Sequence, residues 1–332
     1  MQINNTRMLR GFAAVMTLAL AAGALGGCAA PATKAVALAS HDSFIIPDEL
    51  INKFKTDTGF YLEGGAKLGD TGELTNKLVL TKDSPVADVV FGIDNTFAGV
   101  AEANGIIDGE LVAIDYADVC FNYDKKWFAK AGLTPPSTWR ELTDKKYEGL
   151  TVVQNPTTSS TGLAFLFATV GALGEDNWQL WWSKMRDNGL KVTAGWEDAY
   201  YIEFTGGGGA GKYPIVLSYS SSPAFTIDAA DGESTTASIN SECFRQIEYA
   251  GVLKNAKNPE GARALLAFMQ TKEFQAAMPG ANYVYPIDES VELPEAWAKF
   301  APASESFVDV SGLDFDANRK AWQKQWLEIV QK

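Results

Sequence analysis

Short apolar runs alternate with stretches of helical spacing through the first hundred residues of the chain. The apolar runs are bounded by polar turns and predict buried strands, at residues 35–40, 60–65 and 86–94. Apolar positions recur at helical spacing after each run and predict helices, at residues 48–59, 71–83 and 97–105. Strands that alternate with helices pair in parallel, so this part is expected to form a doubly wound α/β lobe. Ligands bind beyond the carboxyl ends of such strands, where the sequence carries the polar turns HDSF, GDTG and GIDN.

The second half repeats this pattern around two long strands. Residues 111–124 are expected to form a strand that crosses between two lobes, and residues 235–251 the strand that returns beside it. A strand at 149–154 is followed by a hydroxyl-rich turn and an apolar helix that starts near Gly162. Further helices are predicted at residues 177–189, 258–278 and 315–332, the second of them ending at Pro279-Gly280. Their tryptophans are expected to pack inside the protein: Trp178, Trp181, Trp182, Trp322 and Trp326.

The N-terminal residues have the pattern of a targeting segment. Arg7 and Arg10 precede an apolar run, and small residues then lead to Cys28. The sequence Leu-Gly-Gly-Cys resembles the bacterial lipoprotein signal, in which the cysteine is lipidated and becomes the mature N-terminus. We therefore predict a signal peptide at 1–27 and a lipidated tether at 28–35 that holds a soluble protein to the membrane. A transmembrane anchor is the alternative, but the apolar run is short for one.

Acidic residues outnumber basic residues, 41 to 28, which gives the 332-residue chain a formal charge of −13. Residues 1–27 contain two arginines and no acid, so their removal leaves 26 − 41 = −15. This balance argues against nucleic acid as a partner, because nucleic-acid binding depends on clustered lysine and arginine. It fits a cationic ligand, although acidity more commonly serves solubility.

Cys120 and Cys243 remain once the predicted lipidation site is set aside. Two cysteines in an exported protein can form a disulfide, and the long loop they enclose would make that bond stabilising. A pair of buried free thiols is the alternative. Each cysteine lies in a strand-like run, so the bridge requires these two strands to be neighbours. We predict the bridge.

Two turns rich in hydroxyl groups follow predicted strands. Residues 218–222 place one aromatic ring, Tyr219, among four serines before Pro223, which suits a planar ligand with a polar end. Residues 157–161 precede a helix, whose unpaired N–H groups favour an anion such as phosphate. A serine-rich surface turn and ordinary helix capping are the respective alternatives.

The sequence lacks the motifs of common catalytic and metal sites. His41 is its only histidine, and the adjacency of Asp42 and Ser43 does not set the geometry of a catalytic triad. No GxSxG, HExxH, CxxC or P-loop pattern is present. The sequence therefore predicts no catalytic residue, no metal site and no cofactor. Three tyrosines leave a ferric-iron site open as an alternative: Tyr200, Tyr201 and Tyr219.

Several motifs occur in one order from about residue 36 to the C-terminus: HDSF, ADVVFGIDN, NPTTSSTGL, GWEDAYYIEF, VLSYSSSPAF, NYVYPI and NRKAWQKQW. With these motifs the chain resembles the thiamine-binding proteins, which are the extracytoplasmic solute receptors of thiamine ABC transporters. The GW-x-x-AY and LSY-x-x-SPA elements together are fairly specific to that family. The ADVV element and the C-terminal helix are shared more widely with iron and polyamine receptors.

The resemblance implies a two-lobed α/β fold of the type II periplasmic-binding kind. Each lobe would hold a mixed, mostly parallel sheet flanked by helices, with a strand-crossing hinge and the ligand enclosed between the lobes. Residues 36–114 with 245–332 would form lobe 1, and residues 115–244 would form lobe 2. The implied function is capture of thiamine or its phosphates by a monomer, with delivery to the permease subunits of an ABC transporter.

The resemblance also implies a set of ligand contacts. Trp196 and Tyr219 would face the thiazolium charge by cation–π contact, and Asp70 would balance it. The full set is His41, Asp42, Asp70, Thr71, Ser159, Ser160, Trp196, Tyr219, Ser220, Ser221, Ser222 and Tyr283, with Ser159 and Ser160 for the hydroxyl or phosphate end and Tyr283 for stacking. The chain departs from the family at His41, where relatives carry tyrosine, and at Thr157, where an arginine can occur.

Two alternatives to a thiamine receptor remain open. A ferric-iron or polyamine receptor has the same implied fold. A thiaminase-like enzyme would need Cys120 as its nucleophile, but this residue lies in an apolar strand and is expected to pair with Cys243, which argues against a reactive thiolate.

Overall fold

The computed structural model describes residues 33–304 and 306–331. The predicted signal peptide at 1–27, the predicted lipidation site Cys28 and the tether up to residue 32 lie outside the described residues. No helix within the described ranges combines the length and the apolar character that a bilayer span requires.

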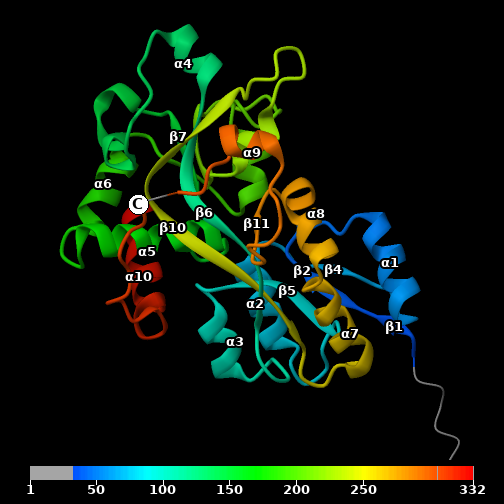
Figure 1. Ribbon diagram of the computed structural model, residues 1–332. Coiled ribbons are helices and arrows are strands. Elements are labelled where there is room, and N and C mark those ends of the chain that lie inside the picture. Colours follow the sequence, from blue (N-terminus) through cyan, green and yellow to red (C-terminus); the bar gives the residue numbers. More distant parts are fainter. Residues whose placement is uncertain (1–32, 305, 332) are drawn as a thin grey trace, which may run out of the picture. The chain divides into compact units, whose positions relative to one another are not determined.

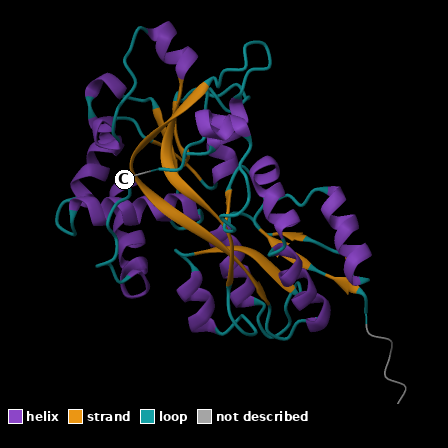
Figure 2. Cartoon of the chain, in the orientation of Figure 1, coloured by secondary structure: helices purple, strands orange, loops and turns teal. Residues whose placement is uncertain are grey.

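The described residues form one nine-stranded sheet with the order β4-β2-β5-β10-β6-β9-β7-β8, and β11 pairs with β6 outside this path. A separate pair, β1 and β3, runs in parallel. The strands are β1 (Ala35–Val36), β2 (Leu38–Ser40), β3 (Tyr61–Leu62), β4 (Ala66–Lys67), β5 (Val89–Asp94), β6 (Val112–Asp124), β7 (Thr151–Gln154), β8 (Lys191–Thr193), β9 (Ile215–Tyr219), β10 (Thr236–Val252) and β11 (Tyr285–Pro286). The helices lie on both sides of this central layer of strands (Figure 2).

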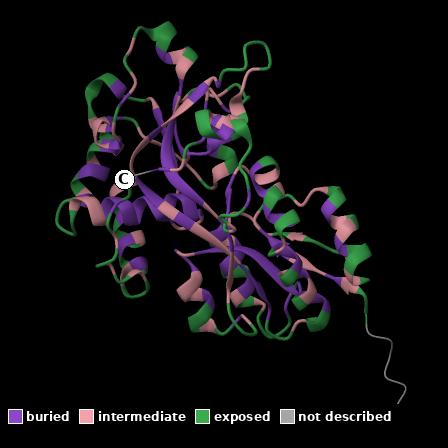
Figure 3. Ribbon diagram, viewed as in Figure 1, coloured by how far each residue is buried: buried purple, intermediate pink, exposed green. Residues whose placement is uncertain are grey.

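The α-helices are α1 (Asp48–Thr58), α2 (Thr71–Leu80), α3 (Ala98–Asn104), α4 (Lys125–Ala131), α5 (Ser160–Leu173), α6 (Trp178–Asp187), α7 (Pro259–Met269), α8 (Lys272–Asn282), α9 (Glu295–Phe300) and α10 (Phe315–Val330). Short 3₁₀ helices are η1 (Trp139–Thr143), η2 (Lys145–Tyr147) and η4 (Ser222–Thr226), and η3 (Asp198–Glu203) is a π-helix. Buried residues follow the strands and the inner faces of these helices (Figure 3). The five tryptophans that were expected to pack inside the protein are all buried, which confirms that prediction.

The sheet has two parallel parts joined by two long antiparallel strands. Strand β2 pairs in parallel with β4 and β5, and β7 pairs in parallel with β8 and β9. Strands β6 and β10 pair with each other in antiparallel fashion and extend through both parts (Figure 1). This confirms the predicted βαβ units and the predicted pairing of the two crossing strands, which are 13 and 17 residues long.

A disulfide joins the two crossing strands, as predicted. Cys120 of β6 and Cys243 of β10 have their Cα atoms 5.0 Å apart. The pairing register of β10 on β6 shifts between Ile239 and Phe244, so the bond lies where the backbone ladder is interrupted. Because it closes a separation of 123 residues, a bond of this kind contributes about 2–4 kcal/mol of stability.

The predicted helical region 258–278 forms two helices, α7 and α8, and its predicted end at Pro279-Gly280 is wrong. Helix α8 continues to Asn282 with Pro279 inside it, and Tyr283 ends it in the left-handed conformation at φ 55°. Proline at this place removes one N–H from the helical ladder, and packing of the helix makes up for that loss. The extra turn carries the Asn282 amide onto the backbone of Ile45, with which it exchanges hydrogen bonds of 2.8 and 2.9 Å.

Helix α10 packs against α5 and α6 (Figure 1). Trp326 of α10 lies edge-on to Trp182 of α6, with ring centroids 5.4 Å apart, and Gln323 donates to the carbonyl of Pro156 at 2.7 Å. The predicted division into lobes had grouped residues 245–332 with lobe 1. That division stays a prediction, and from this packing we propose that α10 belongs with residues 115–244.

Candidate functional site

A cavity of about 310 Å³ lies beyond the carboxyl ends of the strands in both parts of the sheet. Its walls come from the turn after β2, the starts of α2 and α5, the segment after β8, the end of β9, the middle of β10 and the end of α8. The polar turns HDSF and GDTG contribute to this lining, as topology predicts, whereas residues 92–95 (GIDN) do not.

Nine of the twelve predicted ligand residues line the cavity: His41, Asp42, Asp70, Thr71, Ser160, Trp196, Tyr219, Ser222 and Tyr283. The structure does not bring the other three, Ser159, Ser220 and Ser221, to its lining. All three are fully buried, and the hydroxyl of Ser220 lies 3.3 Å from that of Tyr285. Their predicted contact with a ligand has no support in this geometry.

Six aromatic side chains form what we call the aromatic wall of the cavity: Trp196, Tyr200, Tyr201, Tyr219, Phe225 and Tyr283. The ring of Trp196 stacks on Tyr200 with centroids 4.9 Å apart and planes at 14°. Tyr201 meets Trp196 edge-on at 5.2 Å. Phe225 meets Tyr283 edge-on at 5.1 Å. Such a wall offers π faces to a flat or cationic ligand.

The serines of residues 218–222 hold the aromatic wall in place. The indole N–H of Trp196 donates to the hydroxyl oxygen of Ser218 at 2.9 Å, and the Ser218 and Ser222 hydroxyls lie 2.8 Å apart. The hydroxyl of Tyr219 lies 2.8 Å from that of Thr161, which joins the end of β9 to α5. A buried hydroxyl that is hydrogen-bonded to other protein groups in this way positions its neighbours rather than a ligand. The serine-rich stretch is therefore chiefly a support for two aromatic rings.

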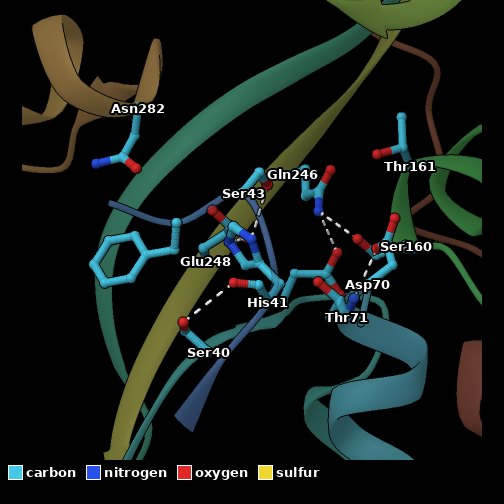
Figure 4. A network of polar contacts seen from close by, with 12 residues as sticks. Ser40, His41, Ser43, Asp70, Thr71, Ser160, Thr161, Gln246, Glu248 and Asn282 are labelled. Carbon is cyan, nitrogen blue, oxygen red and sulfur yellow. Dashed lines mark hydrogen bonds and ion pairs between the residues drawn. The ribbon is translucent and has the colours of Figure 1, made fainter. Parts of the chain in front are cut away.

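The carboxylate of Asp70 is satisfied by the protein's own backbone. It accepts N–H groups from Thr71 at 2.7 Å and from Trp196 at 3.1 Å. It also accepts the N–H of Ser160 at 3.3 Å (Figure 4). Burial raises the pKa of Asp70, and these hydrogen bonds oppose the rise. Asp70 thus connects the start of α2 to the start of α5, where the sequence predicted a site for an external anion. These hydrogen bonds fix the position of the carboxylate without neutralising its charge.

The lining is strongly acidic. It contains six carboxylates, from Asp42, Asp70, Glu73, Glu197, Asp198 and Glu248, together with His41 and no lysine or arginine. Asp42, Glu197 and Asp198 are exposed, whereas the side chain of Glu248 is 13% exposed. Charges in an enclosed site interact more strongly than charges in water, so Glu248 has the greater influence on a bound cation.

His41 and Glu248 form an ion pair at the base of the cavity. The His41 Nε2 atom lies 3.3 Å from the Glu248 Oε1 atom, and the ring's Nδ1 atom lies 3.0 Å from the Ser43 hydroxyl (Figure 4). Burial lowers the pKa of His41, whereas the charge and the hydrogen bond of Glu248 raise it. The raising effects together are larger, so the net shift of the pKa is upward. The carboxyl of Asp115 lies opposite Glu248 in the β6–β10 pair, and burial followed by the charge of Glu248 raises its pKa well above the usual range.

A second polar network lies under the start of α5. The Gln246 amide donates to Asp94 at 2.5 Å. It also donates to the Ser160 hydroxyl at 2.9 Å (Figure 4). Burial is the main reason that the pKa of Asp94 rises to about 7. Asp94 is the last residue of β5, so this network fixes β5, β10 and α5 to one another.

The sequence analysis missed several lining residues, among them Glu197, Phe225, Gln246, Glu248 and Asn282. A usable signal existed for Gln246 and Glu248, because they are polar positions two apart on a predicted strand and hence share one face. Glu197 follows Trp196 directly and could have been included on that basis. Phe225 and Asn282 reach the cavity through η4 and through the last turn of α8, which the sequence did not predict.

The tyrosines of the aromatic wall are poorly suited to bind ferric iron. Burial raises the pKa values of Tyr200, Tyr201 and Tyr219, which disfavours the phenolate form that would ligate the metal. Within residues 33–304 and 306–331, no three histidine, cysteine, aspartate or glutamate side chains are grouped so that they could hold a metal ion.

Comparison with known proteins gives three findings. A family model described as bacterial extracellular solute-binding protein matches residues 92–307. The thiamine-binding periplasmic protein of Salmonella typhimurium is 30% identical over 329 residues, which cover 92% of this chain and 97% of that protein. The solved structure of a periplasmic thiamin binding protein superposes with a TM-score of 0.77 at 26% identity and covers 90% of this chain and 96% of the other.

A ferric binding protein from Campylobacter jejuni has a similar structure at 19% identity, with a TM-score of 0.69 and coverage of 89% and 99%. At this level of identity the likeness concerns the fold alone. Together the structural likenesses confirm the predicted two-lobed α/β fold of the type II periplasmic-binding kind.

Proposed function

Because the chain belongs to the family of bacterial extracellular solute-binding proteins, we propose that it captures thiamine in the cavity and delivers it to the permease of an ABC transporter. One observation carries the choice of ligand. The aromatic wall, with Trp196 stacked on Tyr200, shares a cavity with six carboxylates and no lysine or arginine. Thiamine has a flat pyrimidine and a permanently charged thiazolium ring, which suit π faces and acidic side chains respectively.

Titration with thiamine tests the proposal. Trp196 lies in the aromatic wall, so a bound ligand is expected to quench tryptophan fluorescence, with a Kd below about 1 μM, or about −8 kcal/mol. Spermidine and ferric citrate, titrated in the same way and as competitors, cover the polyamine and iron alternatives. Binding of either one, with no response to thiamine at about 100 μM, would transfer the function to that ligand.

Free thiamine is expected to bind at least about tenfold more tightly than thiamine monophosphate, a difference of about 1.4 kcal/mol. The lining holds no lysine or arginine, and Asp70 already takes the Ser160 N–H at the helix start that would suit a phosphate. A phosphate there would be repelled by the carboxylates of the lining, and no lysine or arginine of the lining would offset this repulsion. Calorimetry with both ligands on one protein preparation measures the ratio, since any inactive fraction cancels. Equal affinities would contradict the expectation.

We further propose that the protein is a receptor without catalytic turnover, anchored as a monomer on the outer side of the cell membrane through lipid at Cys28. The disulfide supports the first part, because it leaves Cys120 with no thiol for a thiaminase-like reaction. The family of extracellular solute-binding proteins supports an extracytoplasmic location. Delivery to permease subunits follows from the same family membership.

A further inference from the structure

Glu248 is a mostly buried carboxylate of the cavity, and no backbone N–H of the described residues donates to its side chain. Asp70 accepts three backbone N–H groups, and Asp42 accepts that of Gly69 at 2.9 Å and is exposed. Glu248 projects from the middle of β10 with its side chain 13% exposed, and its charged partner is His41. A ligand cation that enters this space therefore meets a carboxylate whose partner is the imidazole of His41.

Two features of the surroundings make the protonation of His41 sensitive to a ligand's charge. The carboxyl of Asp115, which is fully buried and lies opposite Glu248 in the β6–β10 pair, has a raised pKa, and this favours its neutral form. The His41 ring lies 5.7 Å from the ring of Phe91. Because this neighbour is apolar, it does not solvate the charge of Glu248 when His41 loses its proton. A fixed cation placed beside a histidine lowers the pKa of that histidine.

We propose that Glu248 balances the positive charge of the bound ligand and that His41 carries this charge in the empty receptor, so that capture of a cation expels one proton from His41. The inference rests on the proposed function for its choice of thiamine as the probe. It assigns to Glu248 the role that the sequence had suggested for Asp70. In the empty receptor His41 then supplies the positive charge that the ligand supplies in the complex.

Other charged groups lie around His41 on neighbouring elements. Asp42 lies in the same turn, Asp70 at the start of α2 and Glu197 in the segment after β8, and the negative charges of Asp70 and Glu197 interact with His41. Lys67 of β4 donates to the backbone oxygens of His41 and Phe44 and lowers the pKa of His41. These groups set where His41 titrates. They do not replace the proton that the ligand displaces.

The sign of the linkage follows directly. Protons bind His41 more strongly in the empty receptor than in the complex, so acid favours the empty receptor. The Kd for thiamine is expected to rise about tenfold per pH unit as pH falls below the pKa of His41 in the empty protein, and to level off at higher pH. Calorimetry in two buffers of different ionisation enthalpy is expected to count up to one proton released per thiamine bound near that pKa.

Three variants make this test specific. His41→Gln keeps a polar side chain without a charge, and it is expected to abolish both the pH slope and the proton release. Glu248→Gln is expected to weaken thiamine binding at pH 8 by about tenfold or more. Glu260→Gln removes an exposed carboxylate on α7, outside the cavity, and is expected to bind as the wild type does.

Because His41 is the only histidine in the chain, its imidazole signals can be followed by NMR without overlap from another histidine. Its pKa is expected to fall when thiamine binds, and to fall in the empty Glu248→Gln protein. Tight binding that is independent of pH, or a pH slope that persists in His41→Gln, would overturn the inference and leave the thiamine receptor intact. Absence of thiamine binding at every pH would instead refute the proposed function. In that case, equal His41 pKa values in wild type and Glu248→Gln would still refute the proposed charge interaction between His41 and Glu248.

Discussion

Replacing Trp196 with alanine is expected to weaken thiamine binding by about 100-fold, which corresponds to about 2.7 kcal/mol. The substitution removes the stacked ring that covers Tyr200 and with it the π face next to the acidic side chains. The fold is expected to survive, because the backbone N–H that Trp196 donates to Asp70 remains and the Ser218 hydroxyl keeps its contact with Ser222. Trp196→Phe retains a flat ring and is expected to lose about tenfold or less.

Calorimetry is the appropriate measurement for these variants, because the substitution also removes the fluorophore expected to report binding. Tyr61→Ala serves as the matched control, since it removes a ring that is 38% exposed and lies outside the cavity. Its Kd is expected to equal that of the wild type. An affinity in Trp196→Ala within about threefold of wild type would show that the aromatic wall does not hold the ligand.

The fold could be predicted where local pattern and long-range pairing agree. The apolar run at 86–94 contains β5, which is buried on both faces, and such strands have uninterrupted hydrophobic sequence. The run at 35–40, predicted as one strand, forms two short strands, β1 and β2. The cysteines in the two long strands added a second constraint on the same pairing. The end of α8 was mispredicted because Pro279 is a strong local signal, whereas the contact of Asn282 with Ile45 is a tertiary one.

The site could be predicted only in part, for a similar reason. Trp196 and Tyr219 stand out because aromatic rings next to glycine or serine at strand ends are unusual in a core. Glu248 looks like an ordinary solvent-facing position of an alternating strand, and its place in the cavity depends on β10 lying beside β5 and on the turn after β2. The role of Asp70 as counter-charge to a ligand stays a prediction, and nothing local in the sequence shows that the N–H groups of Ser160 and Trp196 converge on it.

Replacing Arg245 with methionine is expected to destabilise the protein by about 2–4 kcal/mol, because it leaves the fully buried carboxylate of Asp118 without its counter-charge. The guanidinium donates to both oxygens of that carboxylate, at 2.8 and 3.2 Å, and one oxygen also accepts the N–H of Ser304 at 2.8 Å. Its central carbon lies 4.5 Å from the ring centroids of both Tyr116 and Phe307, so the loss includes cation–π contact. The side chain of Arg245 is 38% exposed, and for that reason the expected loss lies below that of a fully enclosed pair.

Chemical denaturation measures this loss, and two further variants identify its cause. Arg263→Met removes an arginine whose 3.4 Å pair with Asp108 is exposed on both sides, so its expected cost is below about 0.5 kcal/mol. Adding Asp118→Asn to Arg245→Met removes the stranded charge and is expected to restore part of the stability, which a double-mutant cycle would report as a coupling energy of about 1–3 kcal/mol. If Arg245→Met loses no more stability than Arg263→Met, then water solvates the Asp118 carboxylate well enough to replace the guanidinium. The pair links β6, β10 and the segment that contains Ser304, so its loss is expected to lower stability without changing the residues that line the cavity.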